Sequence, residues 1–139
     1  MVSKDCSEWL RFSKIDIDVA QQLFSQQQNP RHRPIEVILY HCQQGAEKAL
    51  KAYMVSNGMF PPKIHEMQEL RIACSQWDSK FGNARLVGYC AFLDPFAVII
   101  RYPKHNLTLD SAIAQRGLNS AKRVYDFVCE RLGLDKEYL

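Results

Sequence analysis

The sequence predicts an all-α fold, an antiparallel up-and-down bundle of about five helices joined by short connections. Apolar residues recur at three- and four-residue steps over most of the chain, which is the period of amphipathic helices. Glycine, proline or runs of polar residues separate these segments from one another. The only β-rich run, residues 97–100, is too short to build a sheet. We expect residues 1–139 to form one domain, since this length is typical of one.

The first two helices are predicted over Ser7 to Gln27 and Pro34 to Gly58. Proline suits a first helical turn and glycine suits the position after a last one. The apolar positions of the first helix are expected at Trp9, Phe12, Ile15 or Asp16, Val19 and Leu23. Those of the second are expected at Ile35, Ile38, Cys42, Ala46, Ala49 and Tyr53.

Three further helices follow the Pro61-Pro62 pair. A short one is predicted over Glu66 to Ser75, and a fourth over about Asn83 to Phe92. A bent connector containing Pro103 should occupy residues 99–106. The last helix should begin near Thr108 or Asp110, either of which can cap free amides, and stop at Gly133. Inward residues are expected at Met67, Leu70 and Cys74, and at Ile113, Leu118, Ala121, Tyr125, Val128 and Leu132.

Composition is that of an ordinary globular domain. Apolar residues make up 47% and charged residues 24%, and the net charge of +3 tolerates a nucleotide or RNA partner without requiring one. The five cysteines are scattered without a C-x-x-C pair, which indicates buried free thiols in a reducing compartment. The first nine residues are too polar for a signal peptide, and no apolar run could span a membrane. We therefore expect a cytoplasmic protein that binds no membrane, no metal and no cofactor.

The second predicted helix carries a polar stripe. At about 100° per residue, Lys48 lies about 20° from His41, Gln44 about 60° and Lys51 about 80°, all toward the same side. An imidazole, an amide and two ammonium groups can hold a phosphate or a ribose. The alternative is a solvated face on which Glu47 and Lys51 pair at i,i+4 while Gln43 and Gln44 are exposed.

The other histidines suggest no metal site, because their spacing fits no ligand set. His65 falls at a predicted helix start, where a capping bond is the expected role. His32 lies in a basic loop and is expected to be solvated.

The string HCQQGAEKALKA, from His41 to Ala52, resembles the signature of the HEPN (higher eukaryotes and prokaryotes nucleotide-binding) domain family. Three further marks occur in the expected order: Trp9-Leu10 with Asp16 and Ala20, the Pro62–Met67 turn, and Arg101-Tyr102-Pro103. The resemblance covers roughly residues 7–131 and implies a helical bundle that commonly dimerises, with the functional groove between protomers. It also implies a small nucleotidyltransferase as a toxin–antitoxin partner.

Several HEPN branches are metal-independent RNases, whose motif is an arginine, four to six residues, and a histidine. In this chain, only three residues separate Arg101 from His105, and Pro103 interrupts any helix that would carry both. The pair is a candidate catalytic site in which histidine moves protons and arginine stabilises the phosphate.

Three functions remain open on the sequence. The first, which we favour, is a nucleotide- or RNA-binding helical module that works with a nucleotidyltransferase. The second is a metal-independent RNase that uses Arg101 and His105. The third is a dimerisation domain without catalysis.

Overall fold

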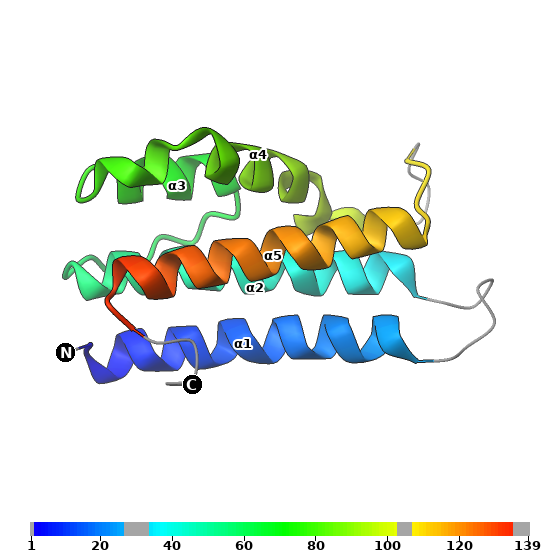
Figure 1. Ribbon diagram of the computed structural model, residues 1–139, viewed down its shortest axis with the longest axis horizontal. Helices are drawn as coiled ribbons and strands as arrows, with labels where there is room; N and C mark the ends of the chain where they lie inside the picture. Colours follow the sequence, from blue (N-terminus) through cyan, green and yellow to red (C-terminus); the bar gives the residue numbers. More distant parts are fainter. Residues whose placement is uncertain (1, 27–33, 103–106, 135–139) are drawn as a thin grey trace.

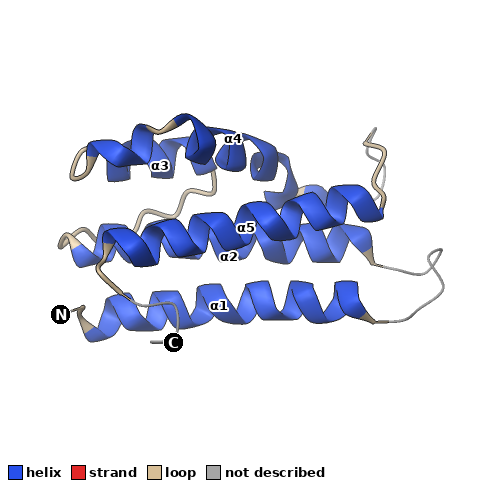
Figure 2. Cartoon of the chain, in the orientation of Figure 1, coloured by secondary structure: helices blue, strands red, loops and turns tan. Residues whose placement is uncertain are grey.

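The computed structural model describes residues 2–26, 34–102 and 107–134, and all regular structure in them is helical. This confirms the all-α bundle. Figure 1 shows α1, α2 and α5 side by side, with α3 and α4 on the face away from α1, and α1 is antiparallel to α2. The α-helices are α1 Lys4–Ser25, α2 Ile35–Ser56, α3 Met67–Ser75, α4 Ala84–Leu93 and α5 Ser111–Arg131. Within the described residues there are also three short 3-10 turns that the sequence did not predict: η2 Ser79–Gly82, η3 Asp94–Ala97 and η4 Ile99–Arg101. Figure 2 shows only helices and loops in the described part of the chain.

α2 is the central helix of the bundle, because α1 packs on one side of it and α5 and α3 on others. Its predicted apolar face is confirmed, since all six expected residues are buried. Gly45 allows the close approach of α1, because a Cβ there would lie 2.6 Å from Cγ1 of Ile17. Gly117 does the same for α5, where a Cβ would lie 2.6 Å from Cδ2 of Leu39.

Side chains cap the helices where the sequence offers short polar residues. Asp110 accepts a hydrogen bond from the Ile113 amide and begins α5, as predicted. Asn83 accepts from the Leu86 amide and begins α4. The glycines predicted to end α2 and α5, Gly58 and Gly133, have φ values of 79° and 74°, which favour glycine.

The predicted apolar face of α1 is confirmed only in part, since Asp16, the alternative to Ile15, is buried and Trp9 and Leu23 are half-buried against the core. Phe12 and Ile15 are 47% and 42% exposed, whereas the buried face consists of Cys6, Leu10, Ser13, Asp16, Ile17 and Ala20. The close approach of α1 to α2 at Gly45 is made by Ile17 and by the Ser13 backbone, so Phe12 and Ile15 lie outside this contact. Ser13 completes this contact, since its hydroxyl donates a 2.6 Å hydrogen bond to the Gly45 carbonyl.

The five cysteines are free and buried, as predicted. Burial raises the pKa of the Cys42 thiol to about 12 and that of Cys6 to about 11, so both are protonated at neutral pH. Among the described helices, none is long and apolar enough to cross a membrane.

Candidate functional site

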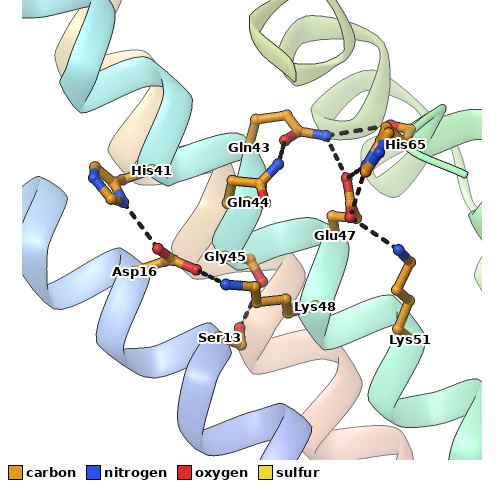
Figure 3. A network of polar contacts seen from close by, with 10 residues as sticks. All are labelled: Ser13, Asp16, His41, Gln43, Gln44, Gly45, Glu47, Lys48, Lys51 and His65. Atoms are coloured by element: carbon orange, nitrogen blue, oxygen red, sulfur yellow. Dashed lines mark hydrogen bonds and ion pairs between the residues drawn. The ribbon is translucent and has the colours of Figure 1, made fainter. Parts of the chain in front are cut away.

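The structure divides the polar residues of α2 into two clusters (Figure 3). In the first, the Asp16 cluster, a carboxylate of α1 lies between two side chains of α2. Asp16 Oδ1 is 2.8 Å from Nδ1 of His41, and Asp16 Oδ2 accepts a 2.6 Å hydrogen bond from Nζ of Lys48. The His41 and Lys48 side chains are 28% and 27% exposed. Both can therefore contact a ligand at the seam between α1 and α2.

The second cluster, the Glu47 cluster, consists of Gln43, Gln44, Glu47, Lys51 and His65. Glu47 accepts hydrogen bonds from Lys51 at 3.0 Å and from Gln43 at 3.1 Å, and its carboxylate lies 3.1 Å from Nδ1 of His65. Gln43 also donates to the backbone carbonyl of His65. The Lys51 and Glu47 side chains are only 7% and 4% exposed. This cluster therefore ties the segment before α3 to α2.

The predicted stripe is shared between these clusters. His41 and Lys48 meet at Asp16, as their small angular separation suggests. Gln44 donates a 2.7 Å hydrogen bond to Gln43, and Lys51 pairs with Glu47, so both belong to the other cluster. The pairing of Glu47 with Lys51 at i,i+4 is confirmed, but the solvated face is wrong, because both residues and Gln43 are buried.

His65 differs from its expected capping role. Its ring contacts Glu47, while the first amide of α3, that of Met67, donates a 2.7 Å hydrogen bond to Asp94. Asp94 comes from the turn after α4, 27 residues later in the chain. The cap of α3 is therefore tertiary, and local sequence could not reveal it.

Asp16 was expected only as a position in the helical pattern of the first helix, and its role as the counter-ion of Lys48 was not predicted. An available signal was a carboxylate in the register of an otherwise apolar face, since buried carboxylates are almost always paired.

Of the two candidate catalytic residues, the structure describes only Arg101. Arg101 is the last residue of η4 and is exposed. His105 lies outside the described residues. Among the described residues, no three His, Cys, Asp or Glu side chains are grouped as metal ligands would be.

A HEPN domain model matches residues 6–132 of this chain. The chain consequently belongs to the HEPN family, and its helical bundle is a module of the nucleotide- and RNA-related class. HEPN domains commonly dimerise. No curated protein matches the chain.

Proposed function

We propose that this HEPN protein binds nucleotides or RNA and contacts their phosphate groups with Lys48 and His41. The observation that supports this is the difference in burial between the two lysines of the stripe. Lys48 keeps 27% of its side chain exposed, whereas Lys51 is buried and neutralised by Glu47. Lysine carries three N–H donors, so Lys48 can bond Asp16 and still donate to a phosphate oxygen.

Asp16 sets the geometry of this site. Its carboxylate holds the Lys48 ammonium and Nδ1 of His41 at the same seam, so Nε2 of His41 is the ring nitrogen that can reach a ligand. Gln44, half-buried beside them on α2, is one turn from both and can add an amide contact. We do not include Lys51 in the binding site, because moving its ammonium to a ligand would leave Glu47 buried without its partner.

The test is binding of a fluorescent single-stranded RNA and of ATP by the wild type, Lys48→Ala and His41→Ala. We expect the dissociation constant to rise roughly tenfold for Lys48→Ala, which is about 1.4 kcal/mol. Lys14→Ala is the matched control, because Lys14 is an exposed lysine of α1 that pairs with Asp18. Equal binding by the wild type and the His41→Ala, Lys48→Ala double variant would remove the Asp16 cluster from the proposal.

The cellular role that we propose is the HEPN half of a toxin–antitoxin pair with a small nucleotidyltransferase, in the cytoplasm and as a homodimer. Membership of the HEPN family supports it. The test is co-purification of the tagged chain with a co-expressed nucleotidyltransferase and measurement of its mass in solution. A monomer that never associates with that enzyme would contradict this role.

A second candidate is a metal-independent RNase that uses Arg101 and His105. The exposure of Arg101 at the end of η4 favours it, because a phosphate could reach the guanidinium. RNA cleavage in chelator that disappears in an Arg101→Ala, His105→Ala double variant would support it. If neither the wild type nor the double variant cleaves RNA, the RNase function is excluded. The protein is then a binding module or a non-catalytic dimerisation domain.

A further inference from the structure

A pocket of about 730 Å³ opens beside the Asp16 cluster, between the first half of α1 and the end of α2. Most of its lining is apolar: Trp9, Phe12, Val55, Met59 and Phe60. Lys48 lines it too, so the pocket and the Asp16 cluster share one ammonium group. A pocket of this size with a few polar groups is typical of small-molecule sites.

The aromatic residues of this pocket are more exposed than a structural role requires. Phe60 is 88% exposed and Phe12 is 47% exposed. Phe12 also lies under the Lys48 ammonium, 5.9 Å from its ring centroid, and Trp9 lies at the same distance from the Lys51 ammonium. Exposed aromatic faces beside a cation are the means by which proteins stack nucleobases while holding the phosphate.

Charge is distributed along the pocket. Lys48 is held at Asp16, whereas Glu8 and Asp5, the acidic lining residues, lie about two and three helical turns earlier on α1. An occupant that fits is anionic at one end, flat and apolar in the middle, and rich in hydrogen-bond donors at the other. A nucleotide has these features in its phosphate, its base, and its ribose hydroxyl and base amino groups.

We propose that this pocket binds the base and ribose of a purine nucleoside monophosphate whose phosphate contacts Lys48. The proposal rests on the proposed function and adds a base-recognition site to it. The base stacks on Phe12 and Phe60, and Asp5 accepts hydrogen bonds from its donors. Glu8 can accept with Oε1, because the hydrogen bonds from Arg11 go to Oε2. A single phosphate is expected because one lysine that is already paired with a carboxylate supplies little positive charge. A purine is expected because its larger face covers more aromatic surface.

Trp9 makes the pocket observable. Trp77 is the only other tryptophan and is not among the described lining residues, so a Trp77→Phe protein reports on Trp9 alone. We would titrate this protein with AMP, GMP, UMP and inorganic phosphate and follow the fluorescence. Saturable quenching by AMP or GMP is expected at concentrations at least threefold lower than for UMP, and none by inorganic phosphate.

Two substitutions test the stacking surface. Phe60→Ala and Phe12→Ala should each raise the dissociation constant for AMP at least fivefold, and the exposure of Phe60 means that its loss should not affect folding. Ile15→Ala is the matched control, since Ile15 is 42% exposed on the same helix and is not among the described lining residues. Its affinity should remain within twofold of the wild type.

The outcomes separate this inference from the proposed function. If Lys48→Ala weakens binding but Phe12→Ala and Phe60→Ala do not, the pocket proposal is overturned and the phosphate site stands. If the wild type binds RNA but neither AMP nor GMP, the pocket proposal is likewise overturned and the proposed function stands. If the wild type binds neither RNA nor nucleotide, the proposed function itself fails. If Phe60→Ala instead abolishes a dimer, the pocket is a protein interface and the inference is overturned.

Discussion

The two polar clusters of α2 contain the same kinds of side chain but differ in burial. Each has a carboxylate between a lysine and a histidine. In the Glu47 cluster the lysine and the carboxylate are inside the protein, and in the Asp16 cluster the lysine and the histidine are more than a quarter exposed. The His65 side chain of the Glu47 cluster is 57% exposed, so exposure of the histidine does not separate the clusters. Exposure of the lysine does, and it distinguishes the structural ion pair from the candidate binding site.

Among these substitutions, Glu47→Ala should lower the free energy of unfolding most. It leaves the Lys51 ammonium buried without its acceptor, whereas Gln43 keeps its hydrogen bond to the His65 carbonyl. Removing one partner of a buried ion pair costs about 3–5 kcal/mol of unfolding free energy. Urea denaturation followed by circular dichroism measures this.

A paired replacement sharpens this result. A Glu47→Leu, Lys51→Met double variant removes both charges and should recover most of the lost stability, because apolar residues of similar volume often replace a buried ion pair without cost. If Glu47→Ala costs less than about 1 kcal/mol, water reaches this pair and the contrast between the clusters is lost.

The next effect concerns the contact between α1 and α2 that places Asp16 beside Lys48. Gly45→Ala should destabilise the fold by roughly 1–3 kcal/mol, because its Cβ would lie 2.6 Å from Ile17 Cγ1 and 3.1 Å from the Ser13 backbone carbonyl. Gly88→Ala in α4 is the matched control, since a Cβ there meets nothing within 4 Å. It should be neutral or stabilise the protein by up to about 1 kcal/mol, as alanine favours helix more than glycine. Similar melting temperatures for the two variants would mean that α1 moves to accommodate the methyl group.

The buried faces of α2 and α1 show how much of the fold could be predicted from the sequence. The helical period of residues 35–53 predicted the buried face of α2 correctly, because small and apolar residues alternate there with polar ones in one register. α1 offers two registers one residue apart, and the larger apolar residues, Phe12 and Ile15, indicated the wrong one. Ile17 and Ser13 make the close contact with Gly45, and that constraint is visible only when both helices are placed.

The candidate site could be predicted only where its residues lie on one helix. His41 and Lys48 share a helix, so their juxtaposition followed from the helical period. Asp16 comes from α1, 32 positions before Lys48, and the hydrogen bond that the Met67 amide donates to Asp94 joins residues 27 positions apart. Local sequence therefore cannot identify the partner in either contact. Burial of Glu47 and Lys51 depends on packing that the i,i+4 spacing does not specify.

Asp16→Asn should have the smallest effect on the free energy of unfolding. It tests most directly whether the Asp16 cluster is more exposed to solvent than the Glu47 cluster. The amide keeps the shape and can still accept one hydrogen bond, while Lys48 and His41 are exposed enough for water to replace the other, so we expect a loss of only about 1–2 kcal/mol. Salt should distinguish the clusters further, because exposed charges are screened and buried ones much less. Between 0.05 M and 1 M sodium chloride, the cost of Asp16→Asn should fall by about half, while that of Glu47→Ala stays nearly constant. Equal salt dependence of the two costs, measured by urea denaturation at both concentrations, would mean that Lys48 is no more available to a phosphate than Lys51.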